Sequence, residues 1–133
     1  AGLCVRDGAR AVDTGDDELL LDLATLASPH RAGIYDPAGR IVCVETQRGC
    51  VFRCSFCFYN KDLSIRNRRF HLDRVKAEID FWLARNPVEL YLMDPVFNLY
   101  AERSKEICRF IAAHNQRGID IFIRASDRRD QTN

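Results

Sequence analysis

Apolar and polar positions in the second half of the chain follow two periods, one typical of strands and one typical of helices. Residues 41–46 are mostly β-branched and apolar on both alternating faces, which predicts a strand buried within a parallel sheet or barrel. From about residue 72 to 85, apolar side chains recur at offsets of zero, four, seven and eight, which marks one helix face: Val75, Ile79, Trp82 and Leu83. Asn86-Pro87 should end that helix.

The same succession continues toward the C-terminus. Residues 88–93 predict a second strand, and Asn98 is expected to cap a second helix. One face of that helix carries Ile107, Phe110, Ile111 and His114, and Gly118 should close it. Residues 119–123 predict a third strand. Strand, helix, strand, helix and strand imply right-handed βαβ crossovers, so the predicted fold class is α/β with a parallel sheet.

The N-terminal part lacks this regularity. Residues 3–6 and 9–13 flank Asp7-Gly8, whose tolerance of positive φ suits a two-residue type I′ hairpin turn. Residues 14–35 show no sustained strand or helix period, and we predict that they form a linker.

The predicted elements do not make a closed architecture. Three parallel strands with two helices cannot close a barrel, and the chain lacks an initiator Met and stops just past a strand. We therefore expect an internal piece of a longer protein. In this interpretation residues 1–40 are a hairpin and linker, and residues 41–133 are the N-terminal half of a truncated parallel (βα) barrel.

Composition and charge exclude several classes of protein. At 133 residues and 47% hydrophobic content, the chain can bury one modest core. No stretch approaches the roughly 20 apolar residues of a membrane helix, and no signal pattern opens the chain, so we expect a cytoplasmic location. The net charge of +1 gives no overall attraction for nucleic acid or an anionic membrane. Arg66, Arg68 and Arg69 make a local basic cluster that is either solvated or binds an anion.

Three of the six cysteines are crowded into one short segment. Cys50, Cys54 and Cys57 have the spacing C-x3-C-x2-C directly after the strand predicted at residues 41–46. Thiolate sulfur is the ligand that iron-sulfur clusters select, and three thiolates on a four-iron cube leave one iron without a protein ligand. Such an open iron can bind and activate a substrate. The other three cysteines are scattered, and we expect them to be small buried hydrophobes: Cys4, Cys43 and Cys108.

With aromatic Phe56 just before the third cysteine, this loop resembles the cluster loop of radical S-adenosylmethionine (SAM) enzymes. The resemblance implies a radical SAM type of barrel in which Cys50, Cys54 and Cys57 hold a 4Fe-4S cluster. It further implies that SAM chelates the fourth iron and is reductively cleaved to a 5′-deoxyadenosyl radical. An electron donor such as flavodoxin or ferredoxin and an unidentified small-molecule or peptide substrate are implied as partners. Phe56 is expected either to contact the adenine of SAM or to pack locally.

Two further segments resemble one branch of that family. The Asp-Pro-x-Phe-Asn pattern at residues 94–98 and the Glu-x-x-Arg-Gly-Cys pattern at residues 45–50 look like the branch with an N-terminal cobalamin-binding domain. Residues 1–40 would then be the tail of such a domain. The resemblance implies cobalamin as a further candidate cofactor and methyl transfer to unactivated carbon as a candidate reaction.

Further cofactor contacts are predicted from topology. In parallel α/β architectures ligands gather at the C-terminal ends of strands, so the cysteine loop, Asp94 and Arg124 should converge. Asp94 could accept a hydrogen bond from an ammonium or a ribose hydroxyl, and Arg124 could pair with a carboxylate. The resemblance implies a Gly-Gly-Glu stretch after the second strand, where this chain has residues 93–98 instead, and this departure counts against a cofactor contact at Asp94. For Glu45 and Arg48 we favour a structural ion pair that braces the loop.

A different class of function stays open at this point. Cys50, Cys54 and Cys57 with a histidine could hold zinc in a non-catalytic module whose basic loop binds an anionic partner. Neither histidine is well placed, because His114 lies on an apolar helix face and His71 opens a helix. We therefore favour packing or capping roles for both histidines. No residue is assigned as a general base or radical relay.

Overall fold

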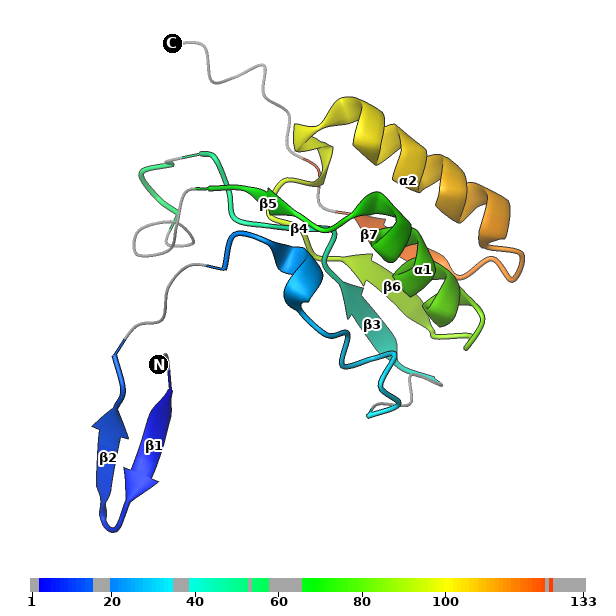
Figure 1. Ribbon diagram of the computed structural model, residues 1–133. Coiled ribbons are helices and arrows are strands. Elements are labelled where there is room, and N and C mark those ends of the chain that lie inside the picture. Colours follow the sequence, from blue (N-terminus) through cyan, green and yellow to red (C-terminus); the bar gives the residue numbers. More distant parts are fainter. Residues whose placement is uncertain are drawn as a thin grey trace.

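The body of the protein is a parallel sheet with two helices on one side (Figure 1). The computed structural model describes residues 3–15, 20–34, 39–52, 54–57, 66–123 and 125. The strand order is β3 (Ile41–Val44), β6 (Glu89–Leu92) and β7 (Asp120–Ile123), with α1 (Leu72–Leu83) and α2 (Ala101–His114) in the two crossovers. Each neighbouring strand pair is parallel. The predicted α/β class with three parallel strands and two helices is therefore confirmed.

The core lies between the sheet and the helices. The predicted face of α1 is buried, and its residues pack with alternate side chains of the sheet: Val42, Val44, Leu90 and Leu92. On α2, Ile107 and Ile111 are buried, whereas His114 is exposed and stacks on the Phe110 ring with 3.9 Å between centroids. No helix in the described ranges is long and apolar enough to cross a membrane.

The other face of the sheet is open, contrary to the prediction that β3 is buried on both faces. Ile41 is 56% exposed and Phe122 is 54% exposed, because α1 and α2 both cover the opposite face. The prediction that the scattered cysteines are buried is also wrong. Cys43 points to the open face, Cys108 lies on the solvent side of α2, and Cys4 belongs to an exposed hairpin.

That hairpin is the predicted N-terminal one, and it projects from the body of the chain (Figure 1). Strands β1 (Cys4–Asp7) and β2 (Arg10–Asp13) pair antiparallel, with Asp7 opposite Arg10. The turn residues are therefore Gly8 and Ala9, one position beyond the prediction. Gly8 has φ +59°, whereas φ of Ala9 is not positive. A type I′ turn needs positive φ at both central residues and a type II′ turn only at the first, so this turn fits type II′.

The segment predicted to be a plain linker contributes to the core. It contains a short 3₁₀ helix, η1 (Leu23–Thr25), and the Leu23 side chain is buried among the core residues. The guanidinium of Arg74 on α1 donates hydrogen bonds to the carbonyl oxygens of Leu23 (3.1 Å) and Leu26 (2.5 Å). The segment is therefore fastened along α1.

The start of α2 also differs from prediction. Asn98 lies inside a second 3₁₀ helix, η2 (Phe97–Leu99), and α2 begins at Ala101 with Tyr100 at the cap position and no side-chain capping bond. The predicted Asn98 cap is wrong because the chain makes this extra turn first. Gly118 follows the helix at φ +65°, after Asn115 has taken the C-cap position.

Candidate functional site

The cysteine loop begins where the chain leaves β3. Cys50, Cys54 and Cys57 are each partly exposed, and the Cys57 amide donates to the Cys54 carbonyl oxygen at 3.1 Å. Within the described ranges, no three His, Cys, Asp or Glu side chains are grouped so that they could hold a metal ion. The donor set nevertheless fits an iron-sulfur cluster in kind and number, because three cysteines share one loop.

The base of this loop is a tight backbone junction. Gly49 has φ +90°, and a Cβ atom there would lie 2.3 Å from the carbonyl oxygen of Arg66. The Asn67 side-chain amide donates to the Gly49 carbonyl oxygen at 3.1 Å. Next to this contact, β4 (Gln47–Arg48) pairs antiparallel with β5 (Arg68–Arg69). Gly49 and Arg66, on either side of the cysteine segment in the sequence, thus lie against each other. This pair was not predicted, because strands of two residues are too short to show a period.

Asp94, which follows β6, accepts hydrogen bonds from the chain just before this junction. Its Oδ1 accepts hydrogen bonds from the backbone amides of Thr46 (2.7 Å) and Gln47 (3.1 Å), and its Oδ2 accepts one from the Thr46 hydroxyl (2.5 Å). Asp94 is 0% exposed. Burial raises the pKa of Asp94, although these three hydrogen bonds act in the opposite direction. Both carboxylate oxygens are thus engaged by the chain itself, and the predicted cofactor contact of Asp94 stays a prediction.

Arg103 on α2 reaches the junction from the helix layer. Its Nη2 donates to the carbonyl oxygens of Thr46 (3.2 Å) and Phe70 (2.7 Å), and the Phe70 amide donates to the Thr46 carbonyl oxygen at 3.1 Å. Burial, followed by the positive charge of Arg69, lowers the pKa of Arg103, against which the nearby Asp94 carboxylate acts. Thr46 therefore connects β3, β6 and α2.

The structure bears differently on the other residues that were predicted for the site. The Glu45–Arg48 ion pair is confirmed, with 2.7 Å between Arg48 Nη2 and Glu45 Oε2. Phe56 is 90% exposed, so local packing of its ring is not observed, and the adenine contact stays a prediction. Arg124 lies outside the described residues. Of the predicted convergence, the structure brings Asp94 to the base of the cysteine loop.

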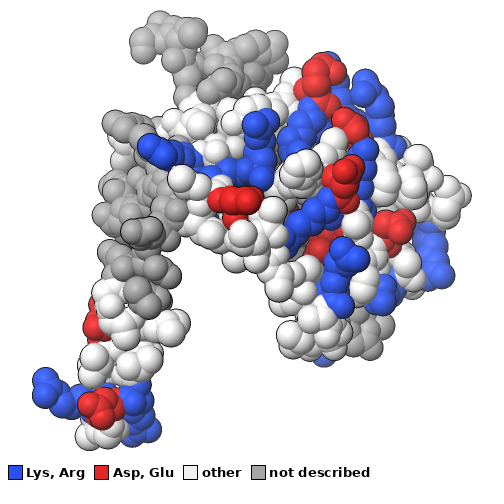
Figure 2. Space-filling model, in the orientation of Figure 1, with Lys and Arg blue, Asp and Glu red and all other residues white. Residues whose placement is uncertain are grey.

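The predicted basic cluster is divided among separate contacts. Arg68 Nη1 donates to the Leu20 carbonyl oxygen at 2.7 Å, and the Arg69 guanidinium lies 4.3 Å from the centroid of the Tyr100 ring. Figure 2 shows basic and acidic side chains interspersed over the body, so the visible face presents no continuous basic surface. His71, considered above as a zinc ligand, is exposed at the start of α1 without a side-chain capping bond.

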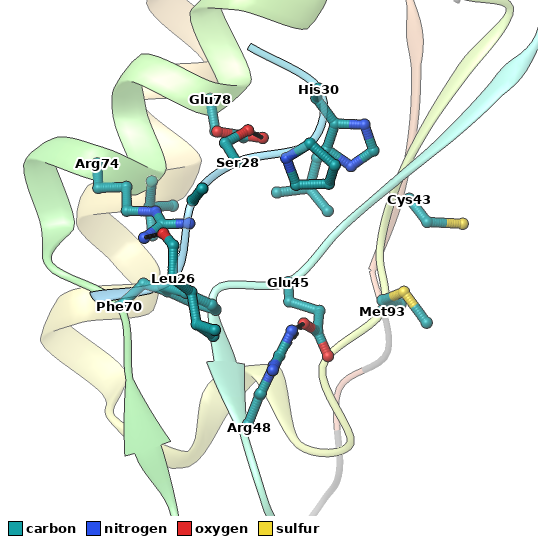
Figure 3. A pocket seen from close by; sticks show the side chains of 14 residues that line it. Leu26, Ser28, His30, Cys43, Glu45, Arg48, Phe70, Arg74, Glu78 and Met93 are labelled. Atoms are coloured by element: carbon teal, nitrogen blue, oxygen red, sulfur yellow. Dashed lines mark hydrogen bonds and ion pairs between the residues drawn. The ribbon is translucent and has the colours of Figure 1, made fainter. Parts of the chain in front are cut away.

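A cavity of about 370 Å³ lies beside the edge strand β3 (Figure 3). Residues 26–30, the end of β3 and one face of α1 form its walls. Ser28 Oγ donates to Glu78 Oε1 at 2.6 Å, and the Glu45–Arg48 ion pair lies at the opposite side in this view. In the sequence, a Glu at position 78 next to the apolar face of α1 is the one signal that could have indicated this cavity.

Comparison with known proteins gives two curated relatives. No protein-family model matches the chain. It is 33% identical over 121 residues to the cobalamin-dependent radical SAM methyltransferase TokK of Streptomyces tokunonensis. It is 32% identical over 121 residues to the 2-(S-pantetheinyl)-carbapenam-3-carboxylate methyltransferase of Streptantibioticus cattleyicolor. Each match covers 84% of this chain but only 18% of the relative. Taken with the C-x3-C-x2-C loop, these matches show that the chain is similar to part of a methyltransferase of the cobalamin-dependent radical SAM family.

Proposed function

We propose that this chain carries the cluster-binding part of a radical SAM methyltransferase. The observation that carries the proposal is the C-x3-C-x2-C set of partly exposed cysteines, Cys50, Cys54 and Cys57, on a loop that follows a parallel strand at its C-terminal end. In this proposal these thiols hold a 4Fe-4S cluster, and the three strands belong to a radical SAM type of barrel. Methyl transfer and the use of cobalamin are extended from the relatives' names to the whole enzyme.

The chain's own residues supply the ligands and their support. The partial exposure of Cys50, Cys54 and Cys57 suits a cluster that must meet both SAM and an electron donor. When bound, such a cluster supplies the electron that breaks a sulfonium carbon–sulfur bond of SAM, which yields the 5′-deoxyadenosyl radical. The open face of the sheet supports the barrel proposal, because Ile41, Cys43 and Phe122 would then point to the barrel interior.

The test uses two matched cysteine variants. Cys54→Ala removes a proposed ligand, whereas Cys108→Ala removes an exposed thiol on α2 that is not a proposed ligand. After anaerobic reconstitution we expect about four irons in the wild-type chain and in Cys108→Ala, and a marked loss in Cys54→Ala. SAM should alter the electron paramagnetic resonance spectrum of the wild-type cluster. Equal iron in the two variants, or zinc bound in place of iron, would show that the proposal is wrong.

A further inference from the structure

We propose that Asp94 acts on the cysteine loop as a positioning residue and not as a ligand of SAM. The inference rests on the proposed function, since it concerns the loop assigned to the cluster. It is carried by the hydrogen bonding of Thr46 and Gln47, which lie between β3 and the first cysteine.

Asp94 joins two strand ends by direct contact. Residues 46 and 94 are far apart in the sequence, yet the carboxylate of Asp94 takes both backbone amides and the hydroxyl at the start of the loop. The Gln47 side-chain amide donates to the Val96 carbonyl oxygen at 2.5 Å, which adds another bond from the same segment to the chain that follows β6. Thr46, Gln47 and Asp94 are each at most 2% exposed, so water cannot readily replace these bonds.

The oxygens of Asp94 are already committed to the chain. Oδ1 is shared by two amides and Oδ2 accepts the Thr46 hydroxyl. An ammonium or ribose hydroxyl would have to displace a buried intramolecular bond and would leave its donor unsatisfied. The contacts therefore assign the carboxylate to the loop.

A fixed stretch of backbone connects Thr46 to the ligands. Thr46 O is held by Arg103 and by the Phe70 amide, and three residues further on Gly49 is pressed against Arg66. The backbone from 46 to 49 is thus held from β6, from α2 and from the returning chain. Cys50 follows at once, so its position depends on this anchored segment.

The test compares variants that separate the two roles of Asp94. Thr46→Val removes the hydroxyl and releases Oδ2, while both amide bonds of Asp94 remain available. Asp94→Asn keeps an oxygen for the two amides and an NH₂ that can donate to the Thr46 hydroxyl. Asp94→Ala removes every bond. Thr25→Val is the matched control, since its hydroxyl donates an exposed bond to the Asp22 carbonyl oxygen at 3.0 Å.

Two readouts are needed, amide hydrogen exchange of the metal-free chain and iron retained after anaerobic reconstitution. The positioning role predicts about tenfold faster exchange at Gln47 in Thr46→Val, from a loss of about 1.4 kcal/mol. It also predicts less than half of the wild-type iron in Thr46→Val and Asp94→Ala, and near wild-type values for Asp94→Asn and Thr25→Val.

The outcomes distinguish this inference from the proposed function. The positioning role would be overturned if Thr46→Val kept the iron content and the amide exchange rates of the wild-type chain. It would also be overturned if Asp94→Asn kept its full iron content but lost the SAM-induced spectral change. If the wild-type chain takes up no iron, the proposed function fails. The exchange rates then still decide whether Asp94 fixes the start of the loop.

Discussion

Replacing Gly49 with Ala tests the backbone junction at the base of the cysteine loop. An L-residue at φ +90° is strained by about 1–2 kcal/mol. In addition, the new Cβ would lie 2.3 Å from Arg66 O, where ordinary contacts begin at 3.4 Å, so one backbone must move by about an ångström. That movement would break the Asn67–Gly49 hydrogen bond and disturb the β4–β5 pair, at about 1 kcal/mol each. We expect a total destabilisation of about 3–4 kcal/mol.

Gly118→Ala is the control for Gly49→Ala. Gly118 has a similar φ of +65°, but apart from its two chain neighbours no described residue has an atom within 4 Å of the position that a Cβ would take. Strain alone, of about 1–2 kcal/mol, is therefore expected there. Urea denaturation of both variants measures the difference, which should be about 2 kcal/mol. Equal losses of unfolding free energy would refute the reasoning, because the contact with Arg66 would then contribute nothing.

Three further predictions concern the core, pH and salt. Leu90→Ala should destabilise by about 2–5 kcal/mol, whereas Phe122→Ala on the open sheet face should lose less than half as much, as measured by urea denaturation. Burial raises the pKa of Asp94 in the folded chain. The contribution of this shift to the free energy of unfolding is therefore fully present below pH 3.8, where the carboxyl group is protonated. This contribution is lost as the pH rises through the raised pKa, so stability relative to Asp94→Asn should fall over that range in denaturation curves recorded at successive pH values. A relative stability that rises instead would contradict the shift. Glu45→Gln should lower stability by less than about 1 kcal/mol and the difference should vanish in 1 M salt, since the pair with Arg48 is partly exposed.

The sequence predicted those parts of the fold that repeat a period over several turns. The helix face from Val75 to Leu83 was found because four apolar positions agree on one period. Leu23 was missed because a three-residue 3₁₀ helix is too short to show a period, and the hydrogen bond to its carbonyl oxygen comes from Arg74, about fifty residues later. The Asn98 cap failed because a good capping residue was present where the chain forms a different turn.

The candidate site was readable to the same limited extent. The cysteine spacing is local and therefore visible in the sequence. The partnership of Asp94 with Thr46 joins two strand ends, and no local pattern contains it. A polar residue after a strand indicated that Asp94 lies near the loop, but only the hydrogen bonds show which groups its oxygens serve.

Because Gly49 and Arg66 are in contact, the number of residues between them should have little effect on the stability of the sheet. With both ends fixed at one point, doubling the number of residues between them adds only about 0.6 kcal/mol of closure entropy. Insertions there would leave the register of β3, β6 and β7 unchanged. The fold can therefore accept insertions of different length and composition between residues 49 and 66 without a change in its sheet.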